Sequence, residues 1–431
     1  MENEKENKFF SFIQKSIKEN IRQSTMIIAL LAIWLIFTFL TNFIFISPRN
    51  LSNLFLQSAT IAILACGMTL VLVAGHLDLS VGSVAGFIGA IAAVLQVKLN
   101  MPTIPTILLA MIVGGMVGVW HGYWVAHKQI PAFIVTLASM IAFRGAILGI
   151  TGGQTIGPMK DSFKAIGQDY LPSFLYRITP KLDQFGNAIK DSYGDVVTGW
   201  VSIFGGKFYE TNQPPFNDIS LIFALIFIAL FIFFQIKKRQ SRIKYGFKVL
   251  PLNFEILKIV LLSVVIALFF SIMIFDKGIP YAILLVIGLT LLFSFISNNT
   301  PFGRHLYAIG GNAEAAKLSG INIKQRLMSL FVIMGVMTAI AGVVFTSRLN
   351  AATTSAGQNF ELDAIAAAII GGTSTMGGVG TIFGSIIGAL VMASLDNGMS
   401  LMNLDVTYQY IIKGLILLLA VWADIATRKK A

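Results

Sequence analysis

Long apolar segments alternate with short polar ones along most of the chain. Eleven of these segments are about as long as a membrane-spanning helix. An α-helix needs about 20 residues to cross a hydrocarbon core of about 30 Å. The pattern predicts an all-α polytopic integral membrane protein. The apolar segments are 24–46, 51–74, 81–97, 104–126, 131–150, 217–236, 255–275, 279–298, 327–346, 382–401 and 407–425.

Basic residues at both ends of the chain indicate its topology. Segment 1–23, the tail 426–431 and the loop 237–254 are rich in Lys and Arg, as short cytoplasmic segments are. Both termini are therefore expected in the cytoplasm, which requires an even number of crossings. A short Ala-rich helix at 363–371 supplies a partial crossing, unless one of the eleven apolar segments is re-entrant. We expect ten to twelve transmembrane helices, including short broken or re-entrant segments.

The same pattern predicts how the chain is organised. A long polar stretch without a convincing helix is expected to form an irregular cap outside the cytoplasm, since unstructured segments of such length usually carry function or cover a site. The expected parts are a first transmembrane half (24–150), the extracytoplasmic cap (151–216), middle helices with the basic cytoplasmic loop (217–298), a cytoplasmic loop (299–326) and a C-terminal transmembrane half (327–425).

Composition narrows the class further. Of 431 residues, 56% are hydrophobic and 12% are charged, whereas soluble domains carry about 25% charged residues. The net charge of +12 lies largely in short loops and tails, so topology explains it better than a nucleic-acid partner does. Cys66 is the single cysteine, which excludes an intrachain disulfide.

The first 23 residues carry a separate signal. Phe9, Ile13, Ile17 and Ile21 recur at every fourth position among charged residues. This spacing predicts an amphipathic helix lying on membrane lipid at the cytoplasmic surface. A helix that binds a partner protein is the alternative.

The polar stretch 299–326 contains a compact pattern. Glu314, Ala315 and Ala316 favour a short helix with a small face for close packing. Gly320 follows and permits the positive φ of a sharp turn. The sequence therefore predicts a helix, a glycine turn and a second helix in a cytoplasmic loop.

Two apolar segments end at glycine-rich breaks, and the sequences after them are similar. Gly75-His76-Leu77-Asp78-Leu79-Ser80 precedes V-G-x-x-x-G-x-x-G-A, and Gly371-Gly372-Thr373 precedes V-G-x-x-x-G-x-x-x-G-A. Paired broken helices in two halves of a chain mark the substrate path of many transporters. The glycines also allow helices to pack closely, and we expect both roles.

The polar residues at the first break have structural explanations as well as functional ones. We expect Asp78 and Ser80 to cap the helix that begins near Val81. His76 lines a polar cavity, where it could bind a sugar hydroxyl, or it packs against neighbouring side chains. No second His or carboxylate stands at metal-ligand spacing from it, so a metal site is not expected.

Other polar residues in or beside the apolar segments also have structural explanations. Glu361 and Asp363 are acids at the N-terminus of the short helix, where the positive end of the helix macrodipole stabilises negative charge. Gln57 and Thr60 lie beside a stripe of small residues that either packs against other helices or lines the path. Arg144 is costly in lipid and needs a partner or an aqueous face.

Three motifs together carry a family resemblance: G-H-L-D-L-S-V-G, E-A-A-x-x-x-G and E-L-D-A-I-A-A-A-I-I-G-G-T-S-T-M-G-G-V-G. They resemble the monosaccharide branch of ABC importer permeases, which serves ribose, xylose and galactose. Within that branch the chain is most similar to D-xylose permeases, through His76, its length and the extra segments near 151–260. The resemblance covers most of 51–150 and 290–425.

The resemblance implies a permease of the bacterial inner membrane without a cofactor. Its implied partners are a separate ATPase, an extracytoplasmic sugar-binding protein and a second permease copy. The residues implied to contact the ATPase are Arg304, Glu314, Ala315, Ala316 and Gly320. Those expected along the path are Gln57, Thr60, His76, Asp78, Ser80, Asp363 and Thr373.

The sequence also bears on two other classes of protein, a membrane enzyme and a secondary transporter. The sequence has no G-x-x-x-x-G-K-[ST] loop, so the chain is not expected to hydrolyse ATP. Its apolar segments show no paired carboxylates, no H-E-x-x-H motif and no Ser-His arrangement, so a membrane enzyme is not expected either. An ion-coupled secondary transporter remains the alternative. It would need acids within the membrane, for which Asp78 and Asp363 are the main candidates.

Overall fold

The computed structural model describes residues 21–181, 198–203, 216–247, 249 and 251–428. The chain divides into two compact units, which are described separately. The main unit comprises 1–46, 54–168 and 282–431, and the hairpin unit comprises 47–53 and 169–281. The amphipathic helix expected within 1–23 lies almost entirely outside the described residues.

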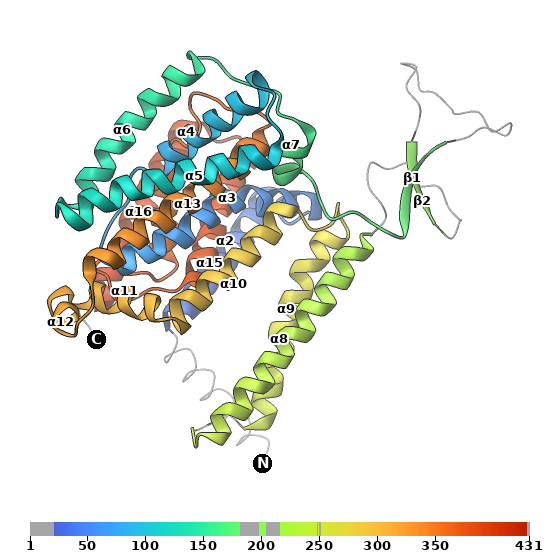
Figure 1. Ribbon diagram of the computed structural model, residues 1–431. Coiled ribbons are helices and arrows are strands. Elements are labelled where there is room, and N and C mark those ends of the chain that lie inside the picture. Colours follow the sequence, from blue (N-terminus) through green and yellow to red (C-terminus); the bar gives the residue numbers. More distant parts are fainter. Residues whose placement is uncertain (1–20, 182–197, 204–215, 248, 250, 429–431) are drawn as a thin grey trace. The chain divides into compact units, whose positions relative to one another are not determined.

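The main unit is helical, and each apolar segment predicted within it coincides with a helix (Figure 1). Two helices, α4 and α5, end in a π-helical turn, η1 and η2. The elements are α2 (Ile21–Leu40), α3 (Pro48–Val73, whose first residues belong to the hairpin unit), α4 (Val81–Ala93), η1 (Val94–Lys98), α5 (Thr103–Gly122), η2 (Tyr123–His127), α6 (Ala132–Thr151), α7 (Asp161–Gln168), α10 (Tyr281–Asn299), α11 (Pro301–Gly311), α12 (Ala313–Leu318), α13 (Ile323–Leu349), α14 (Phe360–Ile370), α15 (Ile382–Leu401) and α16 (Val406–Arg428).

The predicted membrane class is confirmed. Within the described residues of both units, nine helices are long and apolar enough to cross a membrane. The apolar parts of α2 and α16, Met26–Leu40 and Val406–Trp422, are shorter. Helix α14 has 11 residues, about 17 Å at 1.5 Å per residue, which is too short to span a hydrocarbon core of about 30 Å. That it forms a partial crossing stays a prediction.

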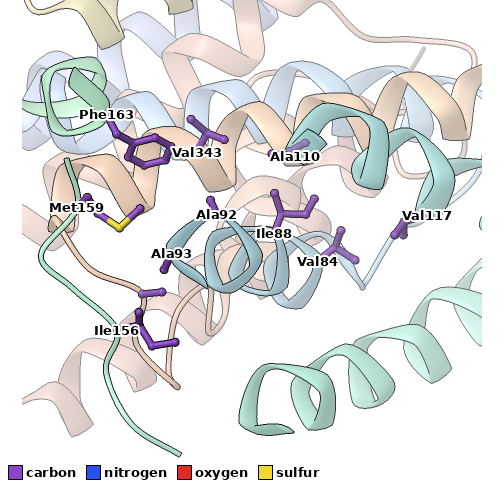
Figure 2. Close-up of a cluster of buried hydrophobic side chains, with 12 residues drawn as sticks. Val84, Ile88, Ala92, Ala93, Ala110, Val117, Ile156, Met159, Phe163 and Val343 are labelled. Carbon is purple, nitrogen blue, oxygen red and sulfur yellow. The ribbon is translucent and has the colours of Figure 1, made fainter. Parts of the chain in front are cut away.

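The core of the main unit lies where α13 packs along α4 and α5 (Figure 1). Gly114 of α5 and Gly335 of α13 face each other so closely that a Cβ on either would overlap the backbone of the other helix. Small residues allow such contacts, which replace the hydrophobic driving force that is absent between helices in lipid. Figure 2 shows the buried cluster beside this contact, which includes Val84, Ile88, Ala92, Ala93, Ala110, Val117, Ile156, Met159, Phe163 and Val343.

The stretch predicted to be an irregular cap contains regular elements. Helix α7 begins it and packs on α13, where the Ser347 hydroxyl donates to the Phe163 carbonyl (2.6 Å) and accepts from the Gly167 amide (2.7 Å). The prediction of no helix is therefore wrong for these residues. The helix has only eight residues, and its tertiary contacts stabilise it more than local propensity does.

The hairpin unit contains a two-stranded sheet and two long helices. Strands β1 (Tyr176–Pro180) and β2 (Thr198–Ser202) pair antiparallel. Helices α8 (Asp218–Lys244) and α9 (Leu252–Ile274) form an antiparallel pair (Figure 1). The side chain of Asn217 caps α8 by accepting from the Ser220 amide (2.8 Å).

Two helices end at residues other than the ends of their apolar segments. Helix α8 continues to Lys244 instead of ending at 236, because Lys, Arg and Gln are good helix formers, and the predicted basic loop begins only at Tyr245. Helix α2 ends at Leu40 instead of 46, where Asn42 and Phe43 adopt positive φ.

Candidate functional site

Two short helices in the predicted cytoplasmic loop form the first part of the site. Helix α11 begins at Pro301 and is capped by Thr300, whose hydroxyl accepts from the Gly303 amide (3.3 Å). The Asn312 side chain caps α12 by accepting from the Ala315 amide (3.0 Å). Asn312 is the single residue between the end of α11 at Gly311 and the start of α12 at Ala313.

The predicted glycine turn follows α12 and is confirmed. Gly320 has φ +83°, its amide donates to the Lys317 carbonyl, and the Ile321 amide donates to the Ala316 carbonyl. This pair of bonds is a Schellman motif, which favours glycine at its left-handed position. Asn322 then caps α13 through the Gln325 amide (3.1 Å).

The residues expected to contact the ATPase do not share one environment. Arg304, Glu314 and Ala315 are exposed, as is Gly320, while Ala316 is buried. Ala316 therefore supports the turn from within. The sequence reasoning missed Leu318, an apolar side chain that is 89% exposed at the end of α12.

Helix α11 contacts both helix breaks of the main unit. The backbone of Gly310 lies against the Val73 carbonyl, the last residue of α3, and against the Gly378 amide. That amide donates to the same Val73 carbonyl (2.8 Å). The two breaks that share a sequence pattern therefore meet beneath α11, and Gly310 has no space for a side chain there.

Tyr307 makes a second connection from α11. Its hydroxyl donates to the carbonyl of Gly380 (2.7 Å), in the segment after the α14 break, and lies 3.0 Å from the Ser297 hydroxyl of α10. Tyr307 thus joins α11 both to α10 and to the segment between α14 and α15. Tyr307 and Gly310 were not singled out from the sequence, since neither belongs to a motif.

At the first break, Asp78 does not act as the predicted cap. Its carboxylate accepts from the Ser80 amide (2.9 Å) and hydroxyl (2.6 Å). The Ser80 side chain makes no capping bond to α4, so the capping prediction is wrong for both. The other carboxylate oxygen lies 4.0 Å from Nδ1 of buried His121, which the sequence reasoning missed.

His76 follows α3 and is half-buried. Its ring lies 6.3 Å from that of Phe331, and the ring of His121 lies 6.4 Å from Phe331 on α13. This arrangement agrees with the packing interpretation of His76, and its role toward a sugar stays a prediction.

The glycines after the first break pack tightly against the loop before α14. A Cβ on Gly82 would overlap the Gly357 carbonyl and the Glu361 carboxylate, and one on Gly86 would overlap the Ala356 carbonyl. Arg144 donates to these two carbonyls, at 2.8 Å each. The predicted need of Arg144 for a partner is thereby met, by backbone oxygens instead of a carboxylate.

An ion triad, in which Asp363 is buried and Lys413 and Asp396 are half-buried, lies among α14, α15 and α16. Nζ of Lys413 is 3.2 Å from the Asp363 carboxylate and 2.8 Å from that of Asp396. Asp363 does lie in the first turn of α14, but this ion pair shows that the macrodipole explanation was incomplete. Lys413 was missed, although a lysine within an apolar segment is itself a signal.

The remaining path residues are not brought together. Gln57 is exposed on α3, whereas Thr60 is buried and its hydroxyl has no hydrogen-bond partner among the described residues. Thr373 is buried beside Gly380 at the second break, and its hydroxyl also has no partner there. Among the predicted path residues, only Asp78 and Ser80 bond to each other.

A family model described as the permease component of a branched-chain amino acid transport system matches residues 50–182 and 196–421. The chain belongs to this permease family. The match includes most of 151–260, so the extra segments do not fall outside the family pattern.

The permease is similar to several curated proteins. It is 41% identical to the xylose transport system permease protein XylH of Escherichia coli K12 over 413 residues, covering 96% of this chain and 94% of that protein. It is 39% identical to XylH of Haemophilus influenzae (95% and 98% covered). It is 30% identical to the ribose import permease protein RbsC of that organism (88% and 86% covered). No solved structure matches it significantly.

Proposed function

We propose that this permease is the membrane subunit of an ATP-driven bacterial importer for a monosaccharide, with D-xylose the favoured substrate. The near full-length identity to xylose permeases, well above that to ribose permeases, supports this substrate. The permease has no phosphate-binding loop of its own, so the ATP is hydrolysed by a separate subunit.

The arrangement of α11 supports the coupling role. The helix presents an exposed surface at Arg304 and, through α12, at Glu314 and Leu318. On its other side, Gly310 and Tyr307 contact the ends of both broken helices. A closing ATPase that moves this surface would move the two breaks together. This connection is the observation that carries the proposal.

The remaining assignments follow from the same role. Both termini and the α11–α12 surface would face the cytoplasm, and a sugar-binding protein would deliver the sugar on the other side. Two permease copies would enclose the path, because a two-site ATPase needs a coupling surface for each nucleotide site.

The test is reconstitution with an ABC ATPase and a sugar-binding protein from the same organism. We expect D-xylose with its binding protein to stimulate ATP hydrolysis and to drive uptake into vesicles, and D-ribose to do so less. A Leu318→Glu variant should lose ATPase binding in co-purification, while Lys317→Glu, which also adds an acid to this exposed helix, should lose less. Equal stimulation by both sugars would contradict the xylose assignment.

The ion-coupled alternative has one observation in its favour. Two acids and a cation lie together at Asp363, Asp396 and Lys413, as they do in coupling sites of secondary transporters. Uptake by the permease alone, abolished by an uncoupler, would support that alternative. Uptake that requires ATP and the ATPase, and survives the uncoupler, would exclude it.

A further inference from the structure

One end of the α8–α9 pair carries a pocket of strongly basic character. Four of its lining side chains are cations and one is a carboxylate, so its net charge is positive. The lining residues are Gln235, Lys238, Arg239, Arg242, Val249, Glu255 and Lys258.

The positions of these residues on α8 show that the pocket is more than the usual excess of basic residues at a helix end. Gln235, Lys238, Arg239 and Arg242 follow the spacing i, i+3, i+4, i+7, which places them on one helical face. Lys237 and Lys244 lie on the same end of α8 but do not line the pocket. The helix thus directs one set of cations toward α9 and leaves others outside.

A carboxylate organises the inner cations. Glu255 of α9 lies 3.3 Å from Arg239 and 3.9 Å from Lys258, and its side chain is 13% exposed. Among the described residues, Lys238 and Arg242 have no ion-pair partner. Both are exposed, so the outer part of the pocket offers two uncompensated cations to an anion.

The length of the apolar part of α8 would place the pocket at the depth of lipid phosphates. The apolar part of α8, Asp218 to Ile236, spans 19 residues, or about 28 Å, which matches the hydrocarbon core of about 30 Å. The first basic residues follow directly. Only 11% of the apolar window of α8, and likewise of α9, is buried in the structure. The side chains of Leu225 and Leu268, for example, are 58% and 61% exposed. Lipid chains would surround such helices.

We propose that this pocket binds the phosphate group of an anionic phospholipid, with Lys238 and Arg242 as its main ligands. Guanidinium groups bind phosphate oxygens in a bidentate manner, and basic pockets between transmembrane helices bind lipid head groups. A lipid is favoured over a soluble phosphate because the pocket adjoins the exposed apolar faces of the same two helices, along which acyl chains can lie.

The test compares two double variants of equal charge change in the full-length permease. Lys238→Gln/Arg242→Gln removes the two uncompensated ligands, and Lys237→Gln/Lys244→Gln removes two cations outside the pocket. Each protein is purified in neutral detergent, and its affinity for phosphatidylglycerol is measured by native mass spectrometry against phosphatidylcholine. At about 1 kcal/mol per cation, the pocket variant should lose roughly thirtyfold in affinity. The control should lose less than threefold.

Several outcomes would overturn the proposal. Equal losses in the two double variants would mean that general positive charge holds the lipid. Stabilisation by inorganic phosphate as large as that by phosphatidylglycerol, measured by thermal unfolding, would assign the pocket to a soluble anion. If the pocket variant does not fold, the single variant Arg242→Gln should lose roughly fivefold in affinity, and an unchanged affinity would refute the assignment.

Discussion

The backbone of Gly310 in α11 rests on the carbonyl oxygen of Val73, the last residue of α3, with no space for even one methyl group between them. The same carbonyl accepts a hydrogen bond from the Gly378 amide (2.8 Å). Helix α11 is therefore in direct contact with both helix breaks, which are far apart in the sequence.

Gly310→Ala should uncouple the permease from its ATPase. The added methyl group must push α11 away from the Val73 carbonyl, because a backbone atom cannot rotate aside. We expect sugar-stimulated ATP hydrolysis to fall at least tenfold. Gly311→Ala is the matched control, since a Cβ on Gly311 meets nothing within 4 Å. Equal activity of the two variants would show that the contact with Val73 plays no part in coupling.

Gly320→Val should also reduce coupling, for a different reason. The space around Gly320 is open, but its φ of +83° costs a residue with a Cβ about 1–2 kcal/mol, and more for a β-branched one. The turn after α12 should then be distorted and ATPase binding weakened, with membrane insertion intact. Asn tolerates this conformation, so Gly320→Asn should retain most of the stimulation. A normal sugar-stimulated ATPase in the Val variant would count against the coupling assignment.

Tyr307→Phe tests the second connection. The change removes the hydroxyl that donates to the Gly380 carbonyl and contacts Ser297, at a cost of about 1–3 kcal/mol if the carbonyl stays buried without a donor. We expect a lower midpoint of thermal unfolding in detergent and weaker stimulation of the ATPase. Tyr408→Phe, at a side chain that is 61% exposed, should change neither. Unaltered unfolding of the Tyr307 variant would indicate that water replaces the hydroxyl.

Lys413→Met should destabilise the C-terminal helices. It leaves the buried Asp363 and the half-buried Asp396 without their shared cation. Because water reaches the Asp396 carboxylate, the cost is expected to be smaller than the about 3–5 kcal/mol of breaking a fully buried pair. We expect a marked loss of thermal stability in detergent. Adding Asp363→Asn should recover part of it, because one uncompensated charge is then removed. Additive losses in the double variant would contradict an interaction between these residues.

Several local features could be read from single segments of sequence. The length of each apolar run predicted a helix, and the pattern around Gly320 predicted a glycine turn of the kind observed. Such features depend on neighbouring residues and on the thickness of a bilayer, both of which a sequence displays directly.

Other local predictions failed where a distant partner competes. The carboxylate of Asp78 was expected to cap α4, but it binds Ser80 and lies near His121. Asp363 was explained by the start of α14, yet it pairs with Lys413, 50 positions away. A capping residue and a buried ion-pair partner look alike in a sequence, because both are polar residues at the edge of an apolar segment.

The sequence by itself determined the membrane class, the approximate helices, the broken segments, the turn at Gly320 and the family. Only the tertiary structure decided that the two breaks meet at Gly310, that Lys413 joins three helices, and that α8 and α9 enclose a basic pocket. The physical reason is the lipid environment. Helices in a bilayer are apolar on nearly all faces, so hydrophobic patterning does not indicate which faces meet, and close backbone contacts and polar pairs decide it.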